Sequence, residues 1–354
     1  MECYKKPEEL LCRSGSLVLV AELRGWHLSA FLFALQGIIR ILSDIFTVIV
    51  NRIRKTDMLK ILITGGSGFI GRNVIDFLAR KNEKYIVYAP SSKELDCLNE
   101  KQVTQYLEKH HFDYVLHFAV YAKRPDNQKD DTKKVEYNLR IFLNFAQNIN
   151  LYGKMFYLGS GAEYDKRFPI VKVREETVGA TIPVDTYGLM KYTIGQLIES
   201  SQNIYNFRLF GIFGKYEYYP LKFISNVCCK AIKNLPLSIS QDVCFDYLWI
   251  EDFCRMLECF LQNEPKYHTY NLVSGKTVRL SEICQIVLKV SKKDLPVLIC
   301  REGMGNEYTA RCDRFLDEFP QFEYTPLEKS IEKLYDWYEN SADIDIYELL
   351  YCAK

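Results

Sequence analysis

The sequence predicts an α/β fold, a Rossmann-type doubly wound parallel sheet with a smaller C-terminal α/β substrate lobe. Three observations predict it: short apolar runs alternate with helical patterns, a glycine-rich turn follows the first run, and the alternation becomes irregular after Gly214. We therefore expect three segments: an extension of uncertain structure over 1–57, a Rossmann domain over 58–214, and mainly a substrate-binding lobe over 215–354, with some return to the Rossmann sheet.

The apolar runs have the length of strands that are buried on both faces of a parallel sheet. Strands are expected at Lys60–Ile63, Tyr85–Tyr88, Tyr114–Ala119, Met155–Leu158 and Asn206–Phe210. Helices are expected at Phe69–Leu78, Val103–Lys109, Val135–Ile149 and Thr186–Ser200. Helices and short strands of the C-terminal lobe are expected within Tyr216–Cys229, Phe245–Phe253, Val278–Val290 and Leu327–Glu339.

Composition narrows the class of protein. The 46 Lys and Arg residues nearly balance 45 Asp and Glu residues, which argues against a nucleic-acid partner. The 12 cysteines show neither a C-x-x-C pair nor zinc-ligand spacing. We expect reduced thiols in a cytoplasmic protein and no metal site.

Residues 1–57 differ from the rest of the chain. Their apolar segments, Ser16–Ala21 and Ala30–Val50, are interrupted or flanked by charges such as Glu22 and Arg40, and they match neither a membrane span nor a secretory signal. Contact with a membrane is expected only through an amphipathic helix in this segment. The alternative is an appendage outside an enzyme fold that begins at Met58.

A glycine-rich turn at residues 64–71 has the spacing G-x-x-G-x-x-G. Gly65 permits a tight turn, Gly68 a close approach to a pyrophosphate, and Gly71 close packing of the helix on the sheet. Phe69 and Ile70 begin a helix whose free N–H groups and positive dipole end favour phosphate. The turn therefore predicts binding of a nicotinamide dinucleotide, with an ordinary glycine-rich turn as the alternative.

The second strand ends without the acidic residue that commonly holds the ribose of NAD. Ser91, Ser92 and Lys93 follow instead, and hydroxyls beside a cation suit a 2′-phosphate. This favours NADP(H) over NAD(H), although an ordinary polar loop would look the same.

Ser160, Tyr187 and Lys191 are the candidate catalytic residues. Tyr187 and Lys191 are four residues apart at a helix start, so they share one face. The ammonium is expected to lower the phenol's pKa from about 10, so that Tyr187 exchanges a proton with substrate, and to reach the nicotinamide ribose. Ser160 follows a strand at the ligand-binding edge, where its hydroxyl can orient a substrate oxygen.

These motifs resemble those of the extended short-chain dehydrogenase/reductases, the NAD-dependent epimerase/dehydratase family, from Met58 to Tyr338. The resemblance extends to Asp113–Ala119, Leu158–Tyr164, Arg208–Gly214, Asp246–Asp252 and Tyr270–Gly275. It implies a nucleotide-sugar substrate, a place for Ala119 beside the cofactor, and a homodimer through the helices at Val135–Ile149 and Thr186–Ser200. The run Ser91–Asp96 is similar to that of GDP-fucose synthases and keto-sugar reductases, which implies NADPH with Asp96 near the adenine.

Two departures from the family narrow the reaction. Fucose synthases carry a Cys two residues after the Ser and a His in the lobe, whereas Ala162 stands here and residues 214–221 contain no His. Dehydratases of the family carry an Asp-Glu pair where this chain has Gly161 and Ala162. The resemblance therefore disfavours both epimerisation at C3 or C5 and dehydration.

Two more departures concern the substrate. Gly211 stands where many relatives have a sugar-binding Asn, and Phe245 where many have a nucleotide-binding Arg. Lys215 or Lys222 could replace the lost charge, or both could be surface lysines.

The first hypothesis is an NAD(P)H-dependent reductase of a nucleotide-activated 4-keto-6-deoxyhexose for polysaccharide synthesis. The second is a nucleotide-sugar C4 epimerase with tightly bound NAD. The third is a non-catalytic dinucleotide-binding sensor or scaffold, against which the joint presence of Ser160, Tyr187 and Lys191 argues.

Overall fold

The computed structural model describes residues 58–121, 131–341 and 343–351. The chain divides into two compact units after Met58, and the second, Leu59–Lys354, carries every element described below. The expected N-terminal extension, with its candidate amphipathic helix, lies outside the described residues. The expected boundary at residue 214 falls inside the second unit and stays a prediction.

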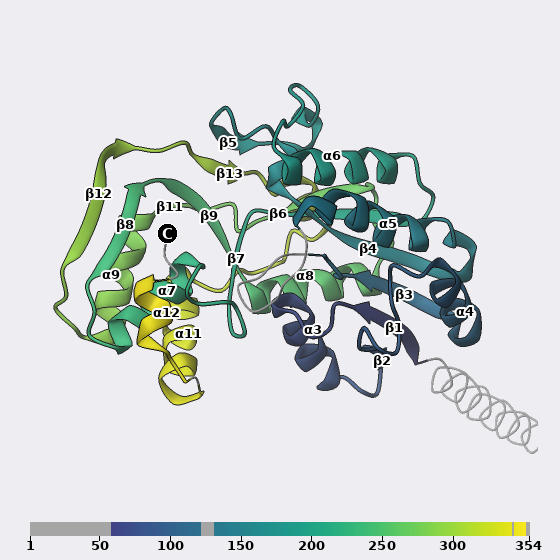
Figure 1. Cartoon of the computed structure of the whole chain (residues 1–354), viewed down its shortest axis with the longest axis horizontal. Helices are drawn as coiled ribbons and strands as arrows, with labels where there is room; N and C mark the ends of the chain where they lie inside the picture. The colour runs from purple at the N-terminus through teal and green to yellow at the C-terminus, as the bar shows by residue number, and fades with distance from the viewer. Residues whose placement is uncertain (1–57, 122–130, 342, 352–354) are drawn as a thin grey trace, which may run out of the picture. The chain divides into compact units, whose positions relative to one another are not determined.

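The centre of the fold is a parallel sheet of six strands in the order β10-β6-β4-β3-β1-β2 (Figure 1). The strands are β1 Leu59–Thr64, β2 Tyr85–Tyr88, β3 Phe112–His117, β4 Tyr152–Ser160, β6 Ile204–Leu209 and β10 Thr269–Leu272. From β1 the chain adds β2 on one side, whereas β3 and the later strands lie on the other. This reversal opens a crevice at the carboxyl ends of β1 and β3, where doubly wound sheets bind ligands.

Helices cover both faces of this sheet (Figure 1). One layer holds α4 Glu100–His110, α5 Lys134–Ala146 and α6 Thr186–Glu199, and the other holds α3 Phe69–Ala79 and α8 Ile250–Gln262. Successive residues of β1 pack against opposite helix layers. Leu62 packs with the first layer, and Ile61 and Ile63 pack with the second. The continuous apolar runs in the sequence follow from this burial on both faces.

The expected α/β class and the expected strands and helices through β6 are confirmed, with shifted ends. The strand expected to reach Ala119 ends at His117, because the N–H groups of Phe118 and Ala119 both donate to Thr64 Oγ1 at 3.1 Å. The helix expected to reach Ile149 ends at Ala146. Ser160 was expected just after its strand and is the last residue of β4.

The remaining strands form a second sheet and a separate parallel pair. The sheet has the order β11-β9-β13-β5, with β7 on β9: β5 Ile170–Val173, β7 Gly211–Phe213, β9 Cys244–Trp249, β11 Thr277–Arg279 and β13 Tyr308–Ala310. The pair is β8 Leu237–Asp242 and β12 Val297–Met304. The helices are α7 Phe223–Ile232, α9 Leu280–Ser291, α10 Asp313–Glu318, α11 Leu327–Ser341 and α12 Ile346–Tyr351. Short 3₁₀ turns are η1 Asp131–Lys133, η2 Ile149–Leu151, η3 Gly161–Glu163 and η4 Glu175–Thr177.

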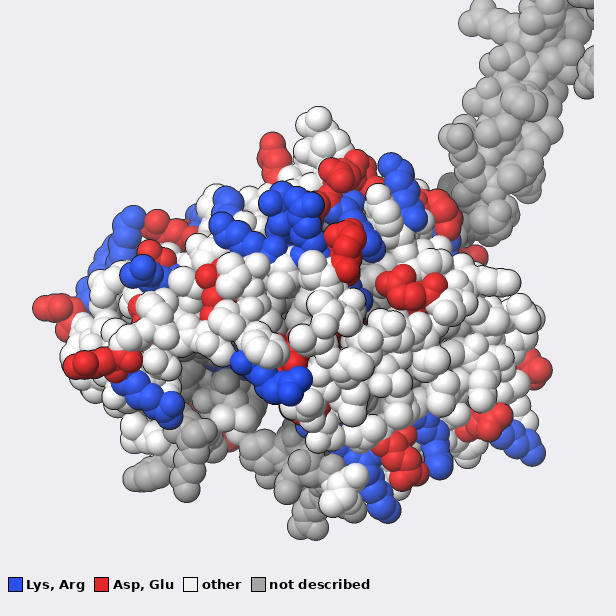
Figure 2. All heavy atoms as spheres, turned by 90° about the horizontal axis from the view of Figure 1, so that it is seen from above, with Lys and Arg blue, Asp and Glu red and all other residues white. Residues whose placement is uncertain are grey.

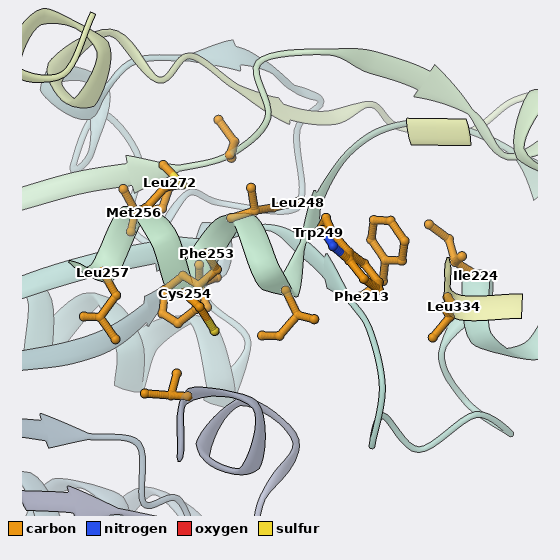
Figure 3. Packing of buried hydrophobic residues seen from close by; sticks show 14 of the residues in the cluster. Phe213, Ile224, Leu248, Trp249, Phe253, Cys254, Met256, Leu257, Leu272 and Leu334 are labelled. Atoms are coloured by element: carbon orange, nitrogen blue, oxygen red, sulfur yellow. The ribbon is translucent and has the colours of Figure 1, made fainter. Parts of the chain in front are cut away.

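One hydrophobic core joins the Rossmann sheet to the C-terminal elements. Figure 3 shows Phe253 and Leu257 of α8 near the sheet, and Trp249 and Phe213 side by side towards Ile224 of α7. The ring centres of Trp249 and Phe213 are 5.2 Å apart. The lobe is therefore packed onto the sheet by apolar contacts and is not a loosely tethered appendage.

Basic and acidic side chains lie close together on the face shown in Figure 2. This mixture agrees with the balanced charge of the chain. Within the described ranges, no helix is both long and apolar enough to cross a membrane.

Glu217 is a buried carboxyl of the C-terminal lobe that accepts a 2.7 Å hydrogen bond from Ser225 Oγ. Burial raises the pKa of Glu217 from 4.5 to about 7, against opposing contributions from Ser225 and Lys222. The pKa of Glu217 is higher in the folded protein than in the unfolded chain. The contribution of protonated Glu217 to the free energy of unfolding is therefore fully present below about pH 4.5 and is lost as the pH rises through about 7.

We expect Glu217→Gln to remove this loss, because the amide keeps the shape of the carboxyl and cannot ionise. The wild type should lose on the order of 3 kcal/mol relative to the variant between these pH values. Urea unfolding at a series of pH values measures the difference. Parallel pH profiles for the two proteins would contradict the prediction.

Candidate active site

The glycine turn between β1 and α3 lies against the end of β3. Gly65 has a φ of +70°, and a Cβ on it would lie 2.8 Å from the backbone of Phe118 and Ala119. A Cβ on Gly71 would collide with the carbonyl oxygen of Gly65. Gly68 is the N-cap of α3 and has no side chain to cap the helix, so the first N–H groups of α3 face the crevice.

A cavity of about 570 Å³ starts at this turn and suits an elongated dinucleotide. It is lined by Ile141 of α5 and by three segments of the chain: residues 64–68 at and after the end of β1, residues within 89–98 after β2, and residues 118–121 after β3. Of the expected cofactor residues, the lining contains Gly65, Gly68, Ser91, Ser92, Asp96 and Ala119. Phe69, Ile70, Gly71 and Lys93 are adjacent in the chain but outside the lining, and so are Tyr187 and Lys191 of α6, which were also expected to bind the cofactor. The absence of an acid in the first turn of α3 also suits a pyrophosphate.

The loop after β2 contains an acid that sequence reasoning missed. The carboxylate of Glu94 accepts hydrogen bonds from both N–H and Oγ of Ser91, each at 2.8 Å, and these bonds lower its pKa. Leu95 is buried and anchors the loop, while Asp96 accepts a bond from the Leu98 N–H. The pattern Ser-x-x-Glu at 91–94, which is typical of a capping box, was the available signal.

The structure brings Ser160 and Tyr187 together from separate parts of the chain. Tyr187 lies in the first turn of α6, which Asp185 caps by accepting the Gly188 N–H at 2.9 Å. The Ser160 side chain lies near enough to the Tyr187 phenol to lower its pKa. Ser160 Oγ also accepts the Ala162 N–H at 3.1 Å. A substrate carbonyl placed at this pair would meet two hydroxyl groups.

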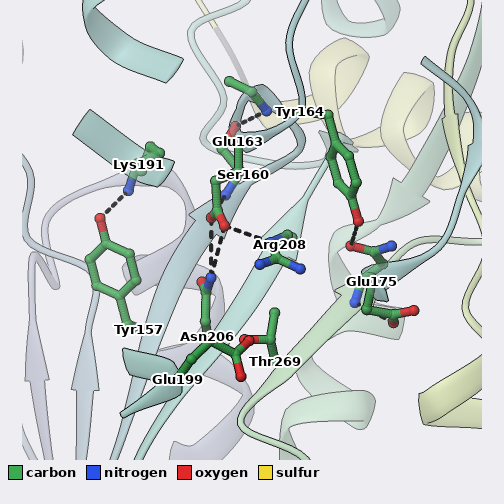
Figure 4. Close-up of polar contacts among 12 residues, drawn as sticks. Tyr157, Ser160, Glu163, Tyr164, Glu175, Lys191, Glu199, Asn206, Arg208 and Thr269 are labelled. Carbon is green, nitrogen blue, oxygen red and sulfur yellow. Dashed lines mark hydrogen bonds and ion pairs between the residues drawn. The ribbon is translucent and has the colours of Figure 1, made fainter. Parts of the chain in front are cut away.

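Lys191 is buried one turn further along α6. Its Nζ donates to the Tyr157 hydroxyl at 2.8 Å and to the Leu158 carbonyl oxygen at 2.6 Å, and it lies 5.9 Å from the centre of the Tyr187 ring. Desolvation lowers its pKa to about 8, and the charge of Glu163 opposes this shift. Figure 4 shows the bond between Lys191 and Tyr157.

The expected lowering of the Tyr187 pKa by Lys191 is wrong for this structure. Withdrawal of the phenol from water raises the pKa of Tyr187, and the nearby Ser160 side chain only partly opposes this. The ammonium is directed at Tyr157 and Leu158, not at the Tyr187 oxygen. Tyr187 is therefore protonated at neutral pH, the state that a general acid needs.

A buried carboxylate holds the backbone of Ser160. Glu163 is fully buried, accepts the Ser160 N–H at 3.1 Å and pairs with Arg208 Nε at 2.5 Å. Asn206 donates to both of its oxygens (Figure 4). Room for the carboxylate comes partly from Gly195, where a Cβ would lie 2.7 Å from Glu163 Oε2.

Sequence reasoning missed four residues beside the catalytic pair: Tyr157, Glu163, Lys166 and Tyr308. The pattern Ser-x-x-Glu at 160–163 is a capping box and could have identified Glu163. Lys166 Nζ lies 5.8 Å from the Tyr187 ring centre and 5.9 Å from that of Tyr308. No local pattern marks Tyr308, which comes from β13, far along the chain.

Phe245, one of the two substrate-side departures, belongs to a cluster of aromatic rings. Phe245 stacks on Tyr247 with ring centres 5.5 Å apart and lies 5.6 Å from Tyr308. Lys215 does not compensate for the missing arginine here, because its Nζ is 3.8 Å from Asp76 and it lines a separate cavity of about 450 Å³. Among the described residues, no group of His, Cys, Asp and Glu could hold a metal ion.

Residues 61–272 match the NAD dependent epimerase/dehydratase family, which is more than half of the chain. The chain belongs to this family. The resemblance seen in the motifs is thereby confirmed, and with it the expectation of an enzyme family that uses a nicotinamide dinucleotide.

The chain is 23% identical over 317 residues to GDP-L-colitose synthase of Yersinia pseudotuberculosis, covering 81% of this chain and 100% of that protein. The structure is similar to GDP-L-fucose synthetase from Naegleria fowleri, with a TM-score of 0.70, 18% identity and coverage of 80% of this chain and 93% of that one. It is also similar to GDP-mannoheptose C4 reductase from Campylobacter jejuni with NADP bound, with a TM-score of 0.68, 17% identity and coverage of 80% and 98%. At these identities the structural likenesses establish the fold.

We expect Glu163→Gln to destabilise the protein by about 3–5 kcal/mol, because it leaves the buried Arg208 without a counter-charge. Arg208 and Glu163 are 1% and 0% exposed, so little water can compensate. Urea unfolding measures the effect.

Two further variants test the cause. Glu163→Gln with Arg208→Met removes both charges and should recover much of the loss. Glu136→Gln breaks an exposed pair, whose side chains are 59% and 56% exposed, and should cost less than about 1 kcal/mol. Equal losses for Glu163→Gln and Glu136→Gln would contradict the assignment.

Proposed function

We propose that this protein is a cytoplasmic NADPH-dependent reductase of a nucleotide-activated 4-keto-6-deoxyhexose, serving polysaccharide synthesis. The observation that supports the proposal is that Tyr187, in the first turn of α6, and Ser160, at the end of β4, lie near each other at the carboxyl edge of the sheet. The named relatives act on or make GDP-linked sugars, so a GDP-linked keto sugar is the first substrate to test. The nine described cysteines are free, which agrees with a reducing compartment.

In the proposed reaction, Tyr187 donates its phenolic proton to the carbonyl oxygen of the sugar. Bound NADPH would supply the hydride that reduces the carbonyl carbon. Ser160 donates a hydrogen bond to the same oxygen and stabilises the charge that develops there. Lys191, whose ammonium donates to Tyr157 and to the Leu158 carbonyl oxygen, would be the group that reaches the nicotinamide ribose of the bound cofactor.

The residues around Ser160 support reduction over dehydration. A Cβ on Gly161 would lie 2.5 Å from the Tyr308 hydroxyl and 2.6 Å from the Phe210 ring, and Ala162 is fully buried. The positions that bear an acidic pair in dehydratases of the family thus have no space for carboxylates. Epimerisation at C3 or C5 is disfavoured as well, because residues 214–221 supply no His.

The homodimer expected through α5 and α6 remains a proposal. The two helices pack against each other and leave three leucines exposed: Leu143, Leu189 and Leu197. A second copy of the chain would cover these side chains.

We expect Tyr187→Phe to lower kcat by roughly 10²–10⁴, because the general acid is removed while the ring remains. The measurement is NADPH oxidation with a GDP-4-keto-6-deoxy sugar, at unchanged thermal stability and cofactor affinity. Near-normal turnover in the variant would rule out the assignment. Interconversion of two sugars without net NADPH oxidation, with NAD retained on the purified protein, would identify a C4 epimerase.

We expect Lys93→Ala to weaken NADPH binding roughly tenfold and to leave NADH binding unchanged, because only NADPH carries the 2′-phosphate. Fluorescence titration of both cofactors measures the two affinities. The matched variant Glu94→Gln removes the neighbouring carboxylate that is bound to Ser91. If Glu94→Gln weakens NADH while Lys93→Ala changes neither affinity, the protein is an NAD enzyme.

A further inference from the structure

The ammonium of Lys191 is held by the strand that also carries Ser160. Lys191 Nζ donates to the Tyr157 hydroxyl at 2.8 Å and to the Leu158 carbonyl oxygen at 2.6 Å. Both acceptors belong to β4, which ends at Ser160. The nitrogen also lies 4.4 Å from the centre of the Tyr157 ring. Tyr157 therefore contacts the ammonium with its ring and with its hydroxyl oxygen.

Both members of this hydrogen bond are withdrawn from water, so solvent cannot easily replace it. Tyr157 is 4% exposed and Lys191 is 7% exposed. Burial raises the pKa of the Tyr157 phenol, so the phenol stays neutral and offers the lone pairs of its oxygen to the ammonium. Desolvation lowers the pKa of Lys191 to about 8, which leaves only a small margin for the charged form at neutral pH. Loss of an acceptor would favour the neutral amine further.

The number of donors on the ammonium determines what these two bonds do. An ammonium has three N–H groups. Among the described residues, Lys191 gives two of them to β4, which leaves one for a ligand. Because the ammonium is tetrahedral, two fixed bonds also fix the direction of the third N–H. The Leu158 acceptor is backbone and does not depend on the side chain at 158, whereas the second acceptor depends on the hydroxyl of Tyr157.

Other charged and titratable groups surround Lys191 and the Tyr187 ring: His117 of β3, Lys134 of α5, and Glu163 and Lys166 in and after η3. The charge of Glu163 raises the pKa of Lys191, and Glu163 is itself paired with Arg208. Burial lowers the pKa of His117 to about 3, so its ring is neutral. In the part of the chain that the structure describes, none of these groups accepts a hydrogen bond from Lys191, so none can replace Tyr157.

We propose that Tyr157 is a positioning residue that keeps the Lys191 ammonium charged and directs its remaining N–H towards the ribose of the bound cofactor. The inference deepens the proposed reductase function and rests on it. It assigns the role to the hydroxyl and not to the ring, which packs against Phe142 and His117 with centre distances of 5.4 and 6.0 Å.

The first test measures NADPH affinity as a function of pH. Tyr157→Phe removes the oxygen and keeps the ring. Loss of a hydrogen bond to a charged group should lower the pKa of Lys191 by about one unit. The variant should therefore bind NADPH roughly fivefold more weakly than the wild type at about pH 8 and almost equally at about pH 6, where the ammonium is restored. The ratio of the two affinities cancels the titration of NADPH itself.

Tyr152→Phe is the matched control for this test. Tyr152 is also a buried tyrosine of β4, and its hydroxyl donates to the Phe145 carbonyl oxygen at 3.0 Å. The control variant should lose stability and show the same affinity ratio to the wild type at both pH values. A ratio for Tyr157→Phe that is independent of pH would overturn the proposal.

The second test follows Lys191 without cofactor or turnover. In protein with isotope-labelled lysine, the NMR signal that is missing from Lys191→Met identifies Lys191. Its titration midpoint should lie near pH 8 in the wild type. The midpoint should be about one unit lower in Tyr157→Phe and unchanged in Tyr152→Phe. Equal midpoints in Tyr157→Phe and the wild type would overturn the proposal.

A measurement on the wild type covers the case in which Tyr157→Phe does not fold. With isotope-labelled tyrosine, the Tyr157 signal should shift at the same midpoint as Lys191, because the two groups share a hydrogen bond. A Tyr157 signal that does not move through this midpoint would contradict the proposal. A lowered Lys191 midpoint in a protein that reduces no keto sugar would support the role of Tyr157 and refute the reductase function, so the two failures are distinguishable.

Discussion

The active site depends on a carboxylate that water cannot reach. Glu163 is fully buried, and the energetic cost of removing its charge from water requires compensation. Arg208 supplies the opposite charge, while Asn206 and the Ser160 N–H supply hydrogen bonds. These partners come from two neighbouring strands, β4 and β6. Because the carboxylate binds the backbone of Ser160 directly, neutralising this charge also fixes the residue that is to orient the substrate.

The sequence predicted the Rossmann half of the molecule well, because each of its strands is a continuous apolar run and each helix has an apolar stripe. The glycine turn and the pair of Tyr187 and Lys191 could be found because each is local in the chain. The second sheet could not be predicted in the same way. Strands such as β7 and β13 have three residues each, too few to display a period, and they form only because partners distant in the chain are present.

The hydrogen-bond partners and the burial of individual side chains could not be predicted from the sequence either. The spacing of Tyr187 and Lys191 indicated one helix face, yet it did not show that the ammonium would be bound by Tyr157 and by the Leu158 carbonyl. Burial then raised the pKa of Tyr187, the opposite of the expected direction. Desolvation depends on all surrounding side chains, so the sign of such a shift requires the folded structure.

The close approach at Gly161 constrains how the family chemistry can change in this lineage. A carboxylate-bearing side chain at 161 would have to occupy the position of the Tyr308 oxygen and the edge of Phe210. A side chain added at 161 would therefore have to displace the Tyr308 phenol of β13 or the Phe210 ring. A residue without a phenol at 308 would free part of this space, so the side chain on one sheet determines which residues the loop after β4 of the other sheet can accommodate.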